Sequence, residues 1–144
     1  AVAWSADGPG PIISSRSRPT VLTPHDGEFA LLAGHMPGAD RVASTRELAA
    51  RLDAVVLLKG RTTVVASPMG EVLVVDNGDE RLATAGSGDV LAGMIAALLA
   101  GGAAPERAAA GAAWLHADAA RRGARLGLLA GDIVELIPTA LGAL

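Results

Sequence analysis

Apolar residues form short strand-like runs in the first half of the chain and repeat at helical spacing in the second. The runs at 20–23 and 54–59 predict strands, and the second is apolar enough for a strand buried on both faces. Pro24 is expected to end the first strand. The runs 63–66 and 72–75 flank a Ser-Pro-Met-Gly turn and predict a hairpin.

Helical spacing predicts five helices. Their expected ranges are 28–34, 44–52, 87–101, 106–122 and 132–142. Asp26 or Gly27 is expected to cap the first helix, and Ser44, with Glu47 three residues on, the second. Pro105 suits a first helical turn. Because strands come first and helices dominate the end, the pattern predicts a layered α/β domain with a mainly parallel sheet.

The start of the chain lacks this regularity. Residues 5–19 are rich in Ser, Gly, Pro and Arg, so segment 1–19 is expected to be loop-rich or mobile. The chain has neither an initiator Met nor the basic segment of a signal peptide, and we expect a fragment or a processed product. The apolar stretch 90–100 is too short to span a bilayer, so no membrane partner is expected. The length of 144 residues suits one domain.

Composition narrows the classes of function. Aromatic residues make up 2% of the chain, its net charge is -3 and its pI is near 5.5. Nucleic-acid surfaces need stacking aromatics or a basic face, so no nucleic-acid partner is expected. The absence of cysteine excludes disulfides, thiolate metal sites and a cysteine nucleophile, and it fits a cytoplasmic location.

The most informative motif is Thr-Ala-Gly-Ser-Gly-Asp-Val-Leu-Ala-Gly at 84–93. A helix that begins on glycines presents unpaired N–H groups and a positive dipole end, which together bind anions. Asp89 would repel an anion unless it does chemical work, such as accepting a proton from the group that attacks a phosphate. The spacing matches neither a P-loop nor a dinucleotide fingerprint, in which Leu91 would be glycine. A plain glycine-rich turn, with Asp89 beside the helix dipole, is the open alternative.

Two further polar segments follow predicted strands, at the sheet edge where open α/β folds bind ligands. Thr-Pro-His-Asp-Gly-Glu-Phe occupies 23–29, and His25 could donate a hydrogen bond to a substrate or a phosphate. Lys-Gly-Arg-Thr-Thr occupies 59–63 and offers two cations and two hydroxyls to the phosphates or ribose of a nucleotide. Taken alone, each segment is better explained as a simple polar turn, so only the combination of motifs favours a ligand site.

The other histidines predict no site. His35 is expected on a surface loop, and His116 is expected to be a hydrogen-bonded histidine between helices. The three histidines lack metal-ligand spacing, so no protein-held metal site is predicted. Arg121, Arg122 and Arg125 predict a solvated basic patch at a helix end.

In this order, the three motifs resemble the ADP/ATP-dependent NAD(P)H-hydrate dehydratase family, a carbohydrate-kinase-like branch of the ribokinase fold. The resemblance covers about 18–138. It implies a three-layer αβα ribokinase-like sandwich, present in part, with 1–144 as the C-terminal portion of one domain. The implied reaction repairs hydrated NADH or NADPH. ADP or ATP phosphorylates the hydroxyl of the hydrated ring, and phosphate then leaves.

The resemblance also implies roles for individual residues. Asp89 would contact the substrate and accept its hydroxyl proton. The N–H groups of Gly86, Ser87 and Gly88 would hold the transferring phosphoryl charge. His25 would contact the substrate. Mg²⁺ would bridge phosphate oxygens and be held mainly by the nucleotide. The residues expected to contact the nucleotide are Lys59, Gly60, Arg61, Thr62, Thr63 and Gly88.

The chain departs from the family pattern in several places. Asp26 replaces the proline that usually follows the histidine, Asn-Gly-Asp at 77–79 replaces Thr-Gly-Asn, and Ser-Ala-Asp at 5–7 replaces Asp-Ala-Asp. The family domain is also much longer, and its N-terminal half supplies glycine contacts to the substrate. The exposed sheet edge would then pair with a second copy or belong to a longer chain.

Two other functions stay open. One is a ribokinase-like kinase of a vitamin precursor, which would release a stable phosphorylated product instead of phosphate. The other is a non-catalytic nucleotide-binding fragment, because loss of half of the domain could abolish the chemistry.

Overall fold

The computed structural model describes residue 13 and residues 15–144. Most of the segment 1–19, including the departure at 5–7, lies outside the described residues. Of this segment, residues 15–19 lie in turns, bends and irregular structure.

Within the described residues, four strands form one sheet in chain order. They are β1 (Val21–Leu22), β2 (Val55–Leu58), β3 (Thr63–Ala66) and β4 (Val72–Val75). β1 and β2 are parallel, whereas β2–β3 and β3–β4 are antiparallel. The predicted hairpin is confirmed, but the prediction of a mainly parallel sheet is wrong for the described strands. Short connections such as those on either side of β3 can join only antiparallel neighbours, because parallel strands need a long crossover.

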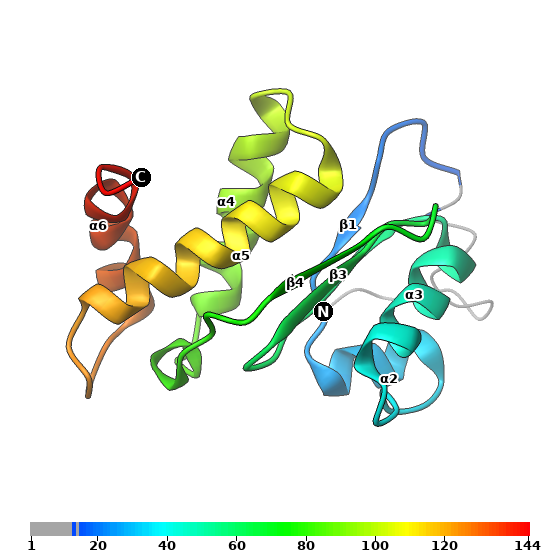
Figure 1. Ribbon diagram of the computed structural model, residues 1–144, viewed down its shortest axis with the longest axis horizontal. Coiled ribbons are helices and arrows are strands. Elements are labelled where there is room, and N and C mark those ends of the chain that lie inside the picture. Colours follow the sequence, from blue (N-terminus) through cyan, green and yellow to red (C-terminus); the bar gives the residue numbers. More distant parts are fainter. Residues whose placement is uncertain (1–12, 14) are drawn as a thin grey trace.

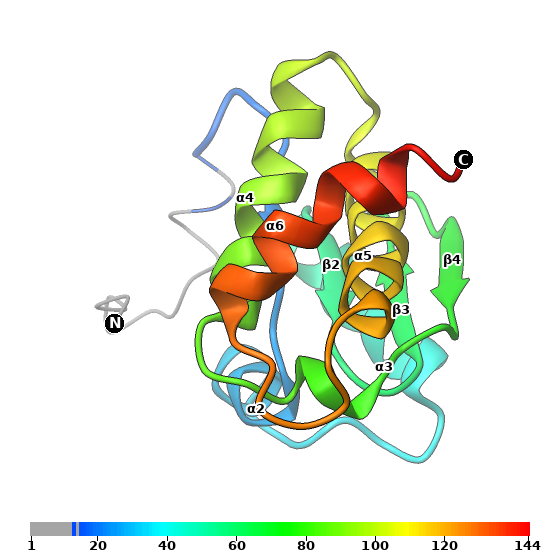
Figure 2. The same cartoon turned by 90° about the vertical axis from the view of Figure 1, so that its left-hand side faces the viewer.

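Helices cover both faces of this sheet (Figure 1). On one face lie α2 (Asp26–Ala33) and α3 (Arg41–Leu52), and on the other lie α4 (Ser87–Ala100) and α5 (Pro105–Arg122). α6 (Ala130–Leu141) packs against α4 and α5 and lies in front of them in Figure 2. The order of helices, sheet and helices confirms the three-layer sandwich. No helix within 15–144 is both long and apolar enough to cross a bilayer.

Side-chain alternation along β2 divides the core into two parts. Val56 and Leu58 pack with Phe29 and Leu48 on the side of α2 and α3. Val55 and Leu57 point the other way, toward Leu91, Ile95 and the alanines of α5. All four β2 residues are buried, which confirms the prediction of a strand covered on both faces.

The helix caps differ from the predicted ones. Asp40, not Ser44, caps α3, and its Oδ1 accepts a hydrogen bond of 2.9 Å from the N–H of Ala43. Ser44 lies inside the helix, where its hydroxyl donates to the Asp40 carbonyl. His25 caps α2 in place of Asp26 or Gly27. The sequence pattern located both helices but began each of them too late, because the residue that caps each helix lies upstream of the predicted cap.

Candidate functional site

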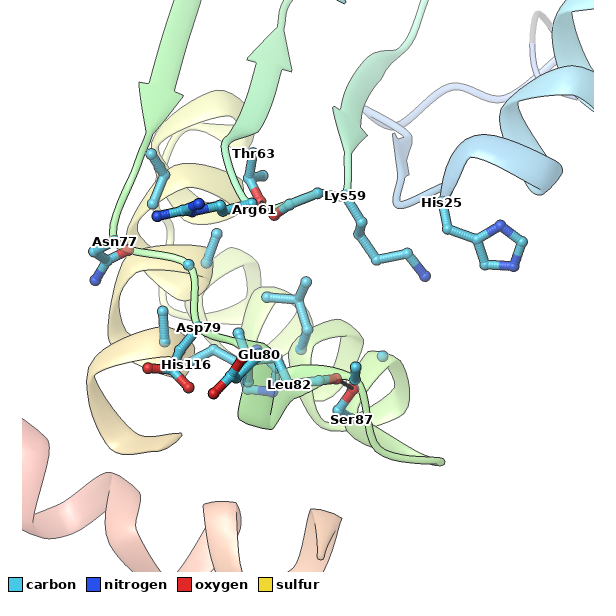
Figure 3. Close-up of a pocket in the computed structure, with 18 of the residues that line it drawn as sticks. His25, Lys59, Arg61, Thr63, Asn77, Asp79, Glu80, Leu82, Ser87 and His116 are labelled. Carbon is cyan, nitrogen blue, oxygen red and sulfur yellow. Dashed lines mark hydrogen bonds between the residues drawn. The ribbon is translucent and has the colours of Figure 1, made fainter. Parts of the chain in front are cut away.

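The carboxyl ends of β1 and β2, the start of α4 and one face of α5 surround a cavity of about 840 Å³ (Figure 3). A volume of this order suits a nucleotide-sized ligand. Seven of the predicted site residues line it, and these are His25, Lys59, Gly60, Arg61, Thr63, Ser87 and Gly88. Thr62 lines an adjoining recess. The three motifs, far apart in sequence, therefore meet at one cavity.

The start of α4 has the features of an anion site. Gly86 precedes the helix with a φ of 85°, a left-handed conformation that favours glycine, and no side chain caps the helix. The N–H of Ser87 donates to the Thr84 carbonyl, whereas the N–H of Gly88 has no partner within 15–144. Gly88 therefore offers an unpaired donor at the positive end of the helix.

Asp89 and Ser87 lie on the same helical turn but differ in their surroundings. Asp89 is exposed and does not line the cavity, and its carboxylate forms no ion pair or hydrogen bond with the described residues. Ser87 is buried, and its hydroxyl donates to the Leu82 carbonyl at 2.6 Å. Ser87 therefore anchors α4 to the 3-10 turn η1 (Glu80–Leu82), and the Asp89 carboxylate is available to accept a proton.

Lys59 connects the three motif segments. Its N–H donates to the Pro24 carbonyl at 2.8 Å, and its Nζ lies 3.3 Å from Glu28 Oε2. A Cβ on Gly88 would lie 3.4 Å from the same Nζ, so the ammonium sits beside the start of α4. In Figure 3 the Lys59 side chain extends between His25 and Ser87. A cation and a helix N-terminus thus face one place in the cavity, which favours a phosphate group there.

His25 and Glu28 form a reciprocal cap at the start of α2. The Glu28 N–H donates to His25 Nδ1 at 3.1 Å, and the His25 N–H donates to Glu28 Oε2 at 2.8 Å. Because Nδ1 accepts a hydrogen bond, a neutral His25 carries its proton on Nε2 and can donate from there. Partial burial would raise the pKa of Glu28, but the His25 N–H and the Lys59 ammonium outweigh it and hold that pKa below its ordinary 4.5.

His116 contradicts the prediction of a hydrogen-bonded histidine. It lies on α5, lines the cavity and is 4% exposed, yet its Nε2 is buried without a partner among the described residues. Burial lowers the pKa of His116 to about 4, so the ring is neutral at pH 7. The buried face of α5 is mostly alanine, which has no polar group to offer the ring. Sequence spacing placed His116 between helices but did not show that its Nε2 would lack a hydrogen-bond partner.

The other polar residues flagged in the sequence have structural partners. Asn77 lines the cavity and donates from Nδ2 to the Trp114 carbonyl at 2.9 Å. Asp79 caps η1 and pairs with Arg81 at 3.1 Å. His35 is exposed, as expected, and packs edge-on against Phe29.

The basic residues at the end of α5 are not a free cationic patch. Arg121 and Arg122 both pair with Asp118, at 3.4 and 2.8 Å. Arg125 lies 4.0 Å from Glu80. The described residues contain no group of three or more His, Cys, Asp or Glu side chains that could hold a metal ion.

Comparisons with known proteins agree with this architecture. The sequence profile of the carbohydrate-kinase family described as NAD(P)H-hydrate dehydratase matches residues 5–138. A bifunctional NAD(P)H-hydrate repair enzyme Nnr of Mycobacterium leprae is 50% identical over 139 residues, which are 92% of this chain and 29% of that protein. An ADP-dependent (S)-NAD(P)H-hydrate dehydratase of Neisseria meningitidis is 48% identical over 121 residues, which are 78% of this chain and 41% of that protein.

The solved structures point the same way. The ADP/ATP-dependent NAD(P)H-hydrate dehydratase of Bacillus subtilis, co-crystallised with ATP and Mg²⁺, superposes with a TM-score of 0.83 at 33% identity over 90% of this chain and 49% of the other. The fold is therefore a ribokinase-like α/β sandwich. Within that class, the chain belongs to the NAD(P)H-hydrate dehydratase family. It spans less than half the length of each of these relatives.

Proposed function

We propose that this chain binds ADP or ATP in the cavity and forms the nucleotide and catalytic part of an NAD(P)H-hydrate dehydratase. The observation that carries the proposal is the meeting of two groups at one point in the cavity, with Asp89 next to them on α4 but outside the cavity lining. The unpaired N–H of Gly88 and the Lys59 ammonium face the place for a phosphoryl group, and Asp89 follows on the same helical turn. Family membership supports the same reading, since relatives are named as ADP- or ATP-dependent dehydratases.

In the proposed reaction the chain positions a phosphoryl transfer. Asp89 accepts the proton of the substrate hydroxyl as its oxygen attacks the terminal phosphorus of the nucleotide, whose P–O bond breaks. The Gly88 N–H and Lys59 stabilise the charge on the transferring group. His25 donates from Nε2 to the substrate. Phosphate then leaves with the C–O bonding electrons, and loss of a proton from the neighbouring carbon restores the reduced nicotinamide ring.

Arg61 and the hydroxyls of Thr62 and Thr63 are proposed to hold the nucleotide beyond its terminal phosphate. Arg61 lines both recesses and has no ion pair with the part of the chain that is described, so its charge is available to an anion. Mg²⁺ would be held mainly by the bound nucleotide and would neutralise the charge of its phosphates.

We also propose that the outer edge of β1 is covered in the working protein. Within the described residues β1 pairs only with β2, so its other edge presents unpaired backbone groups. Either a second copy of the chain or further residues of a longer chain would cover it. The reduced ring substrate and the lack of cysteine fit a cytoplasmic protein.

Calorimetric titration of the 144-residue chain with ADP and ATP tests the nucleotide site. Saturable binding supports it, and no binding of either nucleotide refutes it. Incubation with hydrated NADH and ATP then separates the open functions. Release of phosphate with NADH supports the dehydratase, a stable phosphorylated product supports a vitamin-precursor type of kinase, and binding without turnover supports a non-catalytic fragment.

A further inference from the structure

One arginine ties the His25 turn to the Lys59 turn. Arg41 is the first residue of α3, and its Nη2 donates to Asp26 Oδ1 at 2.8 Å and to the Lys59 carbonyl at 2.9 Å. Both bonds are partly buried. We propose that Asp26 and Arg41 are positioning residues of the ligand site, which hold the substrate-side turn and the nucleotide-side turn in register. The inference rests on the proposed function, because it assigns these residues to that same site.

The contacts around Lys59 show how the Asp26–Arg41 pair affects the position of the Lys59 side chain. The Lys59 N–H is bonded to Pro24, its carbonyl to Arg41 and its ammonium to Glu28. Two of these bonds fix the backbone of Lys59, and that backbone sets where the ammonium reaches the start of α4. Without Arg41 the Lys59 carbonyl would have no hydrogen-bond partner among the described residues. The backbone that positions the Lys59 side chain would then be held by one hydrogen bond instead of two.

Arg41 lies so close to Gly60 that a side chain at this position would meet it. A Cβ at Gly60 would lie 3.1 Å from Arg41 Nη2 and 3.2 Å from the Thr62 carbonyl. Both distances are tighter than ordinary van der Waals contact, so a side chain here would push the guanidinium away. The glycine of this segment is therefore matched to the arginine, which supports a built arrangement over a chance surface ion pair.

Substitution of Asp26 can remove the ion pair with Arg41 without changing the backbone conformation of the turn. It occupies the first position of α2, where proline is tolerated. The preceding residue, His25, is extended at φ -83° and ψ 176°, as a residue before proline must be. The Asp26 N–H donates no hydrogen bond within 15–144. Asp26→Pro should therefore keep the turn and remove only the carboxylate.

The test measures ADP affinity of the 144-residue chain and of five variants by calorimetry. Asp26→Asn, Arg41→Gln and Asp26→Pro should each bind ADP about tenfold more weakly, as expected for loss of a charge-assisted hydrogen bond. The double variant Asp26→Asn/Arg41→Gln should be no weaker than Arg41→Gln alone, because both changes break one arrangement. Glu71→Gln is the control, since it removes one negative charge from a comparable pair with Arg107 that lines neither cavity.

The sign of the Asp26 effect is diagnostic. Loss of a carboxylate near an anion site should tighten ADP binding if charge alone matters, so weaker binding indicates positioning. Unchanged or tighter binding of Asp26→Asn, with wild-type binding intact, overturns the inference and leaves the proposed function standing. If the wild-type chain binds no ADP, the proposed function fails, and amide hydrogen exchange decides the positioning role. At least tenfold faster exchange of the Lys59 N–H in Arg41→Gln supports it, and unchanged exchange overturns it.

Discussion

The buried, unpartnered His116 makes a quantitative prediction about stability and pH. Burial lowers the pKa of this histidine to about 4 in the folded chain, against 6.5 in the unfolded chain. The unfolded state therefore binds the extra proton first as the pH falls. The contribution of the neutral His116 to the free energy of unfolding is therefore fully present above pH 6.5. It is lost progressively as the pH falls from 6.5 to about 4.

The magnitude follows from the two pKa values. Each unit of difference corresponds to about 1.4 kcal/mol, so the total loss approaches about 3 kcal/mol well below pH 4. Between pH 7.5 and pH 5, where the unfolded ring is charged and the folded ring is still neutral, the loss is about 2 kcal/mol. This is a large fraction of the free energy of unfolding of a small domain.

Urea unfolding at pH 7.5 and at pH 5 measures this loss. The wild-type chain should lose about 2 kcal/mol more over this interval than His116→Gln, which keeps a polar group but cannot titrate. His35→Gln is the matched control, because it removes an exposed histidine and should show the wild-type pH dependence. Equal pH dependence of the wild-type chain and His116→Gln would refute the assignment of a neutral, unpaired His116.

The remaining predictions concern the reaction, two glycines and a cap. In a complete dehydratase containing this chain, Asp89→Asn should lower turnover about a thousandfold and leave ADP affinity within about twofold, and near-normal turnover would remove Asp89 from the mechanism. Gly78→Ala should lower the free energy of unfolding by about 1–3 kcal/mol, because its Cβ would collide with the Arg61 carbonyl. Gly111→Ala should raise the free energy of unfolding by up to about 1 kcal/mol, because the added Cβ inside α5 meets nothing within 4 Å. Equal shifts of the melting temperature in Gly78→Ala and Gly111→Ala would contradict both predictions. Asp40→Ala should cost about 1 kcal/mol and Ser44→Ala less, and the reverse order in urea unfolding would contradict the observed cap.

Local patterns predicted most of the secondary structure. The hairpin 63–66/72–75 and the start of α4 at Ser87 were predicted to the residue, because short apolar runs and a glycine turn are encoded within a few neighbours. The sheet was misjudged as mainly parallel. That error came from weighing the order of strands and helices along the chain over the length of the connections, which for β3 forbids a crossover.

The ligand site was predicted less evenly. Each motif was located because glycine, cation and acid stand at meaningful spacing within one segment, and the cavity brings seven of those residues together. Arg41 was missed because it joins segments fifteen and eighteen residues away, and sequence spacing does not report such contacts. The environment of His116 was missed for the same reason, since the cavity that it lines is built by residues of η1, α4 and the strands.

His25 shows how a structural and a functional reading of one residue can both hold. From sequence, a turn residue and a substrate donor were alternatives. The structure assigns the two ring nitrogens separately, because Nδ1 accepts from the Glu28 N–H whereas Nε2 lies 3.6 Å from Glu28 Oε2, beyond a good hydrogen bond. The cap thus fixes the tautomer that leaves a proton on Nε2. Since the same Glu28 oxygen also holds Lys59, the cap that starts α2 orients both the proposed substrate donor and the proposed phosphate cation.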